Sequence, residues 1–91
     1  IKTCLDMQLQ FATSFEPDYR GLPRRLQTTL EKKLRMLLED SRHPSLRVKK
    51  MEGFDAIFEA RFSKGYRFTF QKKYYGYFIR RAGSHDVLRN P

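Results

Sequence analysis

The sequence contains a single cysteine and no long apolar run, and these two shortages exclude several classes of protein. Cys4 has no partner for an internal disulfide, and no set of cysteine and histidine residues has the spacing of zinc ligands. The longest uncharged stretches are far shorter than a membrane span, and residues 1–11 lack the apolar core of a signal peptide. We therefore expect a cytoplasmic protein that does not span a membrane and uses no metal or cofactor.

Acidic residues are also scarce, and the scarcity is greatest in the second half of the chain. The whole chain carries 19 lysines and arginines against 10 acidic residues, a net charge of +9. Residues 45–91 hold 11 basic and 4 acidic residues, which leaves +7 there and only +2 in residues 1–44. Such a surplus attracts phosphate backbones at long range and favours nucleic acid as the ligand. The alternatives are a solvated basic surface, or one that an acidic partner protein covers.

The length predicts a single domain over residues 1–91. A chain this short buries about 60–65% of its unfolded surface, so its core must be used economically. The apolar content of 40%, with eight phenylalanines and five tyrosines, suffices for one sheet covered by helices. It is too high for a disordered basic tail.

The first part of the chain predicts a strand and a short helix. Apolar and polar residues alternate from Leu5 to Phe11, which is the period of a half-buried strand. Ser14 is placed to cap a helix over Phe15 to Arg20. Gly21 then offers a left-handed exit from that helix.

A second helix is predicted from Pro23 to Asp40. Its leucines recur every three or four residues and are Leu22, Leu26, Leu30, Leu34, Leu37 and Leu38. The opposite face is charged, so the helix is amphipathic and lies on a core. Pro44 forces the preceding residue out of the helical conformation.

Strands are predicted at 46–51, 55–62, 66–71 and 77–82, with turns at 63–65 and 72–76. The resulting order, β-α-α-β-β-β(-β), predicts an α+β fold in which a small, mainly antiparallel sheet packs against an N-terminal helical pair.

Alternation within the strands predicts the two faces of the sheet. Phe58, Ala60 and Phe62 share one side of their strand, which we place under the helices together with the phenylalanines of the next strand. The opposite face then presents an open surface with three charged residues, namely Glu59, Arg61 and Arg67.

These charges suit phosphodiester cleavage in RNA, which needs cations at the phosphate, a base for the 2′-hydroxyl proton and an acid for the leaving oxygen. Arginine grips two phosphate oxygens at once, so Arg61 and Arg67 are candidates to hold the phosphate. The candidates to bind the RNA backbone are Lys49, Lys50, Arg80 and Arg81. Alternation allows only one of the two consecutive arginines to face the site. Arg61 paired with a nearby acid, and lysines that are merely solvated, are the competing interpretations.

His85 is the candidate for proton transfer, because histidine titrates near neutral pH and this one follows the last strand in a loop. Glu59 is a second candidate, and a simple pair with an arginine is its alternative role. Asp86 either orients His85, assists RNA binding or caps a turn. His43, before a proline, is an ordinary loop residue by its context.

Tyrosines at 74, 75 and 77 cluster around the last predicted turn. They are placed either to stack on exposed bases or to pack and protect the hairpin.

Read together, these residues resemble the RelE/ParE toxin superfamily of bacterial and archaeal toxin–antitoxin modules. The resemblance covers roughly Ser14 to Pro91. Its pieces are Leu34-x-x-Leu37-Leu38, His43-Pro44-Ser45-Leu46, Lys49-Lys50-Met51-Glu52-Gly53, Phe58-Glu59-Ala60-Arg61, Gly65-Tyr66-Arg67-Phe68 and Gly83-Ser84-His85-Asp86-Val87-Leu88. The fold that this resemblance implies is the small RelE-type sheet with two N-terminal helices.

The superfamily implies one of two activities. RelE-like and YafQ-like members cleave mRNA in the ribosomal A site without metal, whereas ParE-like members inhibit DNA gyrase. Arg67 resembles the arginine that stabilises the transition state in RelE-like nucleases, and His85 stands where YafQ-like toxins place a catalytic histidine. The resemblance thus favours an mRNA endoribonuclease, with the ribosome as partner. A gyrase inhibitor and a degenerate binding module are the alternatives.

The sequence also departs from RelE at two places. Phe58 and Ala60 stand where RelE carries a pair of lysines, and Lys49 and Lys50 lie earlier in the chain. The aromatic residue that stacks on a substrate base in several relatives has no clear counterpart. The resemblance further implies a cognate antitoxin, and the charge of +9 predicts that this antitoxin offers an acidic or amphipathic segment.

Overall fold

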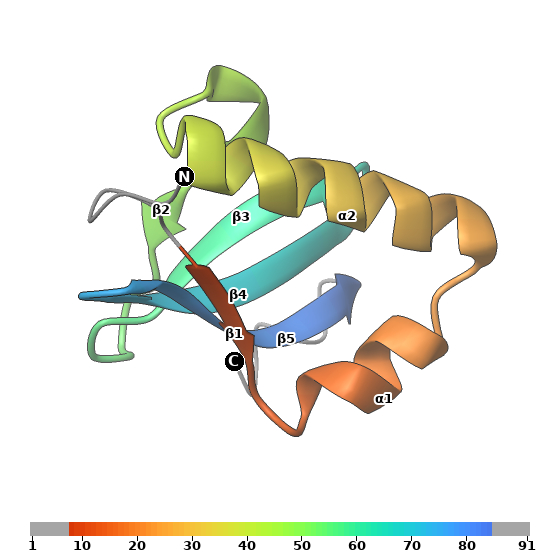
Figure 1. The fold of residues 1–91 in the computed structure, drawn as a ribbon, viewed down its shortest axis with the longest axis horizontal. Helices are drawn as coiled ribbons and strands as arrows, with labels where there is room; N and C mark the ends of the chain where they lie inside the picture. The colour runs from red at the N-terminus through yellow and green to blue at the C-terminus, as the bar shows by residue number, and fades with distance from the viewer. Residues whose placement is uncertain (1–7, 85–91) are drawn as a thin grey trace, which may run out of the picture.

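The computed structural model describes residues 8–84 and shows helices on one side of a sheet (Figure 1). Leu5 and Met7 of the predicted first strand, together with His85 and Asp86, lie outside the described residues. The elements in chain order are β1 (Gln8–Phe11), α1 (Phe15–Arg20), α2 (Arg24–Glu39), the 3-10 turn η1 (Pro44–Leu46), β2 (Lys49–Lys50), β3 (Phe58–Ser63), β4 (Tyr66–Lys73) and β5 (Gly76–Ser84). The predicted order of strands and helices is confirmed.

The strands form one sheet in the order β1-β5-β4-β3-β2. β1 runs parallel to β5, and the other neighbours are antiparallel. α2 crosses one face of this sheet, while α1 lies beside β5 (Figure 1). The α+β class, with a mostly antiparallel sheet and N-terminal helices, is therefore confirmed. In the described part of the chain, no helix combines the length and the apolar composition needed to cross a membrane.

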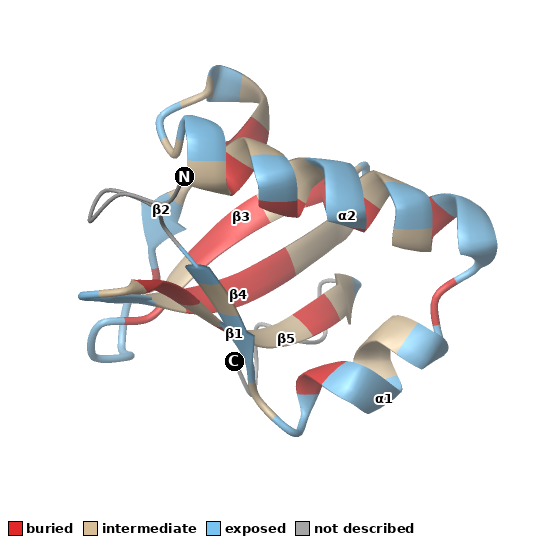
Figure 2. Cartoon of the chain, in the orientation of Figure 1, coloured by how far each residue is buried: buried red, intermediate tan, exposed pale blue. Residues whose placement is uncertain are grey.

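The core lies between α2 and the sheet, where the buried residues of both face each other (Figure 2). The helix contributes Leu26, Leu30, Leu34 and Leu37, as its period predicted. The main residues that meet them are Ala60, Phe62, Phe68, Phe70 and Ile79. Each such leucine contributes about 2 kcal/mol by leaving water. Because α2 buries its leucines against this face of the sheet, the opposite face stays free of α2.

The two helices are linked to each other and to the sheet through polar contacts. The Tyr19 hydroxyl donates to Glu31 of α2, which raises the pKa of Tyr19, and the Gln27 side chain donates to the Tyr19 carbonyl at 2.9 Å. Ser14 was expected to cap α1, but its hydroxyl instead donates to the Arg80 carbonyl of β5 at 2.8 Å. Gly21 was expected to be left-handed, but its φ is −75°. α1 ends in a right-handed turn in which the Gly21 N–H donates to the Pro17 carbonyl.

Asp18 ties α1 to β5. Its carboxylate accepts from Arg81 Nε at 2.6 Å, from Arg81 Nη2 at 3.2 Å and from the Ala82 N–H at 3.1 Å. The Asp18 side chain is 16% exposed and the Arg81 side chain 29% exposed, so water screens this ion pair only partly. The hydrogen bond to Asp18 also raises the pKa of Arg81.

The Asp18→Ala variant is expected to lose about 2 kcal/mol of unfolding free energy, because it leaves the Arg81 charge and the Ala82 N–H without this acceptor. Asp18→Asn keeps one acceptor oxygen but not the charge, so its unfolding free energy is expected to lie between those of the wild-type protein and Asp18→Ala. Urea denaturation followed by circular dichroism measures both. Equal stability of all three proteins would show that the contact does not anchor α1.

The strand predicted at 46–51 is wrong in length, since only Lys49–Lys50 pair with β3. Pro44 starts η1, and the His43 side chain caps it: the Ser45 N–H donates to His43 Nδ1 at 3.2 Å. Arg47 then takes a left-handed conformation with φ 49°, which interrupts an extended strand. The next strand also begins later than predicted, at Phe58, because Ala56 has φ 58°.

The last two strands are longer than predicted, and their turn is correspondingly shorter, at Tyr74 and Tyr75. The pairing contains two irregularities. One lies between Arg61 and Ser63 of β3, and the other lies where Thr69 pairs with Arg81 while the adjacent Phe70 pairs with Ile79. The second makes Arg80 an extra residue in β5 and re-aims the side chains around it.

Candidate functional site

The register gathers charged side chains on the sheet face opposite α2. Arg61 and Arg67 stand directly opposite each other in β3 and β4, and Lys49 stands opposite Glu59. Directly opposite residues project to the same face of a sheet. Because Ala60, between Glu59 and Arg61, faces the core, these charged residues project from the other side. We call Lys49, Glu59, Arg61 and Arg67 the charged face.

Glu59 pairs with Arg67 rather than with Arg61. Its Oε1 lies 3.5 Å from Arg67 Nε, and Arg67 Nη1 also donates to the Tyr66 carbonyl at 3.2 Å. The two side chains are only 22% and 10% exposed, for Arg67 and Glu59 respectively. Arg67 is therefore held in place by two contacts. Within residues 8–84, Arg61 has no ion-pair partner.

The expectation of a uniformly open surface was wrong for Glu59, which is buried, as is Thr69 opposite it. The physical reason is the row to which they belong. Glu59 and Thr69 stand in the middle of that row, between Lys49 and Arg81, and the Arg67 guanidinium lies against the Glu59 carboxylate. The accessible cations of the charged face therefore lie around a buried carboxylate.

Arg80 and Arg81 diverge because of the irregularity in β5. Arg81 reaches Asp18 of α1, while Arg80 Nη1 lies 3.4 Å from Gln71 Oε1 on β4. Arg81 thus has a structural contact that sequence reasoning did not foresee. Of the two lysines of β2, Lys49 lies opposite Glu59 and Lys50 opposite Phe58, and both are exposed.

β5 ends beside the arginine pair. Gly83 stands opposite Arg67, and Ser84 stands opposite Tyr66. The chain thus leaves the described residues one position past the row of Arg61 and Arg67. His85 and Asp86 follow directly in sequence and lie outside the described part.

The tyrosines around the last turn separate into two kinds. Tyr77 is buried and meets the Phe70 ring edge-on at 5.4 Å, so it belongs to the core. Tyr74 is 97% exposed and contacts the Tyr75 ring. Of these three tyrosines, Tyr74 and Tyr75 in the turn are the ones that a ligand can reach.

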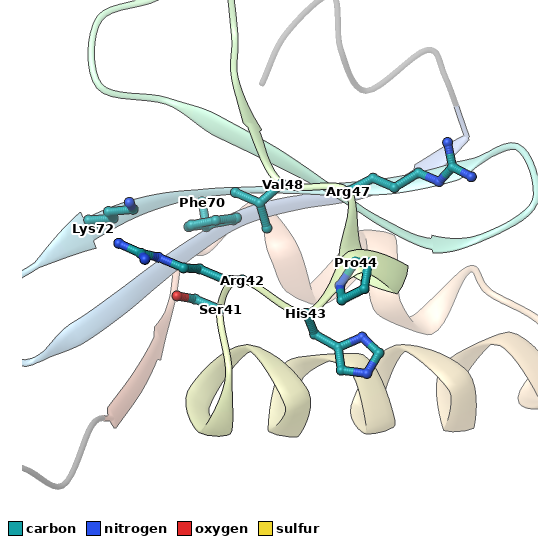
Figure 3. A pocket seen from close by; sticks show the side chains of 8 residues that line it. All are labelled: Ser41, Arg42, His43, Pro44, Arg47, Val48, Phe70 and Lys72. Carbon is teal, nitrogen blue, oxygen red and sulfur yellow. The ribbon is translucent and has the colours of Figure 1, made fainter.

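Two hollows adjoin the turn at Pro44 and Arg47. The first, of about 370 Å³, has Val48 and Phe70 as its apolar part and is lined by Ser41, Arg42, His43, Pro44, Arg47, Val48, Phe70 and Lys72 (Figure 3). His43 points away from Arg42 in this view, which agrees with its capping role in η1. The second, of about 480 Å³, includes Arg61 of the charged face. Sequence reasoning missed both, because their residues come from separate elements.

The charged face contains groups for binding and positioning a phosphate. No three histidine, cysteine, aspartate or glutamate residues among residues 8–84 gather as metal ligands. Two opposed arginines provide the donors that a phosphodiester needs.

No family model and no curated protein matches the sequence. Solved structures do match the fold. The YafQ toxin of E. coli aligns with a TM-score of 0.74 at 10% identity, covering 90% of this chain and 97% of that one. The isolated E. coli RelE toxin aligns with a TM-score of 0.67 at 25% identity, covering 86% and 83%. The chain has the fold of the RelE and YafQ toxins.

Structures of complexes show the same RelE/YafQ fold. The E. coli DinJ–YafQ toxin–antitoxin complex matches with a TM-score of 0.75 at 11% identity over 91% of this chain and 97% of that one. The RelB–RelE complex of Methanococcus jannaschii matches with a TM-score of 0.67 at 17% identity over 89% and 95%. The fold implied by the sequence resemblance to the RelE/ParE superfamily is therefore confirmed.

Proposed function

We propose that this protein is the toxin of a type II toxin–antitoxin module and an endoribonuclease that cleaves mRNA on the ribosome and arrests translation. The observation that carries the proposal is the charged face: Arg61 and Arg67 stand opposite each other, and Arg67 is held by Glu59. The RelE/YafQ fold supports the same class of protein.

In the proposed reaction, the 2′-oxygen of the RNA attacks the adjacent phosphorus and the bond from phosphorus to the 5′-oxygen breaks. The proton of the 2′-hydroxyl goes to a base, and an acid gives a proton to the leaving 5′-oxygen. No metal is needed, because the substrate supplies the nucleophile. Arg61 and Arg67 stabilise the charge on the phosphate oxygens, since their guanidinium groups each offer two parallel donors.

His85 is proposed to transfer one of the two protons, and Asp86 to assist it or to contact RNA. Glu59 is the second candidate for proton transfer, but its contact with Arg67 supports a positioning role instead. A carboxylate that takes up a proton loses most of its attraction for the guanidinium 3.5 Å away. Lys49, Lys50 and Arg80 are proposed to contact the RNA backbone, and Arg81 acts there only insofar as its bond to Asp18 allows.

The proposed partner is an antitoxin with an acidic or amphipathic segment. The charge of +9 favours such a segment, and the similar toxins YafQ and RelE are seen in complexes with DinJ and RelB. We further propose that residues 1–91 act as one domain in the cytoplasm.

The experiment is primer-extension mapping of mRNA in a translation reaction with purified wild-type protein and His85→Ala. Wild-type protein is expected to produce discrete cuts inside the coding region, and the variant to produce them about a hundredfold more slowly. Cuts that persist at full rate in His85→Ala would move proton transfer to Glu59 or the lysines. Intact mRNA with normal translation would refute the nuclease, and a gyrase supercoiling assay would then test the ParE-like alternative.

A further inference from the structure

We propose that the hollow beside Arg61, here called the edge pocket, binds a phosphate of the RNA strand adjacent to the one that is cleaved; this inference rests on the proposed nuclease function. The edge pocket has a volume of about 480 Å³ and collects side chains from three elements. Its polar residues are Lys33 of α2, Ser45 of η1, Arg47 after η1, and Arg61, Ser63 and Lys64 of the β3–β4 hairpin.

The charge of the edge pocket predicts an anion as its ligand. Four of the lining residues are cations and none is an aspartate or glutamate. Like charges that converge on one hollow repel each other, and the repulsion is relieved when an anion lies between them. Ser63 adds a hydroxyl group that can donate to a phosphate oxygen.

Lys33 is positioned for such a ligand. It is half-buried, and its Nζ lies 3.0 Å from Ser45 Oγ. Ser45 Oγ is in turn 2.9 Å from His43 Nδ1. One hydrogen bond of the ammonium group is therefore used to orient it, while the group retains two further N–H donors for a ligand.

Arg47 has a backbone conformation that is costly for a residue with a side chain. Its φ of 49° is left-handed, which costs about 1–2 kcal/mol relative to the right-handed region. Arg47 lines both hollows, and in Figure 3 its side chain extends away from Arg42 and Lys72. Arg47 therefore brings a second guanidinium to the edge pocket, which Arg61 also lines.

Continuity with the charged face identifies the anion as part of an RNA strand. Arg61 lines the edge pocket and also stands directly opposite Arg67. A strand whose scissile phosphate lies between these two arginines would bring a neighbouring phosphate to the pocket. Cations spaced along such a path are the usual way in which a protein follows a single strand.

The test compares two triple variants of equal charge. The pocket variant carries Lys33→Gln, Arg47→Gln and Lys64→Gln, and the control variant carries the same change at Arg25, Lys32 and Arg35, all exposed on α2. The probe is a fluorescent RNA oligonucleotide with a 2′-O-methyl group at every position, which cannot be cleaved through a 2′-hydroxyl. Fluorescence anisotropy at several KCl concentrations gives the salt dependence of binding.

Because the edge pocket holds one phosphate, the slope of log K against log salt should fall in magnitude by about 0.7 in the pocket variant, which is the contribution of one phosphate of a single strand. The control variant should keep the wild-type slope. Circular dichroism checks that both variants are folded.

Equal slopes for the two variants would refute the edge pocket, while cleavage by the wild-type protein would leave the nuclease intact. A pocket variant that loses affinity for an oligoglutamate peptide but not for the oligonucleotide would also refute it, and would assign the pocket to an acidic protein segment. Absence of mRNA cleavage by wild-type protein would instead refute the proposed function itself, and with it the role of the edge pocket in cleavage.

Discussion

The Arg67→Ala variant is expected to cleave mRNA about a thousandfold more slowly than wild-type protein. In the charged face, Glu59 Oε1 lies 3.5 Å from Arg67 Nε, and the Tyr66 carbonyl accepts from Nη1 at 3.2 Å. These contacts hold the guanidinium before the substrate arrives. It can therefore stabilise the charge that develops on the phosphate without first reorganising. Single-turnover cleavage of ribosome-bound mRNA measures the effect.

Two further variants separate chemistry from stability. Arg67→Lys keeps the charge but loses the pair of parallel donors, so an intermediate rate is expected. Arg67→Ala also leaves the buried Glu59 without its ion-pair partner, which costs about 1 kcal/mol. Adding Glu59→Gln should restore that stability but not the cleavage. Full activity in Arg67→Ala would show that this arginine does not act on the phosphate.

The elements with a strong periodic pattern could be predicted from the sequence. The leucine repeat gave both the extent and the buried face of α2, because burial of one stripe is what stabilises a helix of this kind. The alternation in 58–62 likewise predicted that Ala60 and Phe62 meet the core. Where a turn uses residues without a strong conformational signature, as at Arg47 and Ala56, local patterns predicted strand and the structure has none.

Contacts between distant parts of the chain could not be predicted in the same way. Nothing in residues 8–11 indicates parallel pairing with β5, because alternation reports burial and not the neighbouring strand. The Asp18–Arg81 contact joins residues 63 positions apart and depends on the irregularity in β5. An extra residue in one strand changes which side chains share a face, and strict alternation does not show it.

The charged face was predicted in part. The alternation of residues along a strand shows which side chains share a face of the sheet, so Glu59, Arg61 and Arg67 could be grouped from the sequence. Which arginine Glu59 contacts depends on register, and the burial of Glu59 depends on long side chains in adjacent strands. Sequence reasoning did not assign Lys33 to a site, because a lysine on an amphipathic helix is usually solvated. Its place in the edge pocket arises only from packing of α2 against the hairpin.

Gly76→Ala is expected to have the largest effect on stability, a loss of about 3 kcal/mol or more in the free energy of unfolding. Gly76 begins β5 and pairs with Gln8 of β1. A Cβ atom at this position would lie 2.1 Å from the Gln8 carbonyl oxygen and 2.6 Å from the Gln8 nitrogen. Both are backbone atoms that cannot rotate away, so β1 must separate from β5 or the variant must distort the strand. Urea denaturation measures the loss, and hydrogen exchange at residues 8–11 reports the release of β1.

Gly53→Ala provides the control that isolates the steric contact from the backbone conformation. Both glycines have a positive φ, 146° at Gly76 and 83° at Gly53, but an added Cβ at Gly53 would meet nothing within 4 Å. Its variant should lose only the conformational cost of about 1–2 kcal/mol. A Gly76→Ala variant no less stable than Gly53→Ala would mean that the close approach of β1 and β5 does not constrain this position. A larger loss, with faster exchange confined to β1, would show that a glycine is required there because two backbones meet.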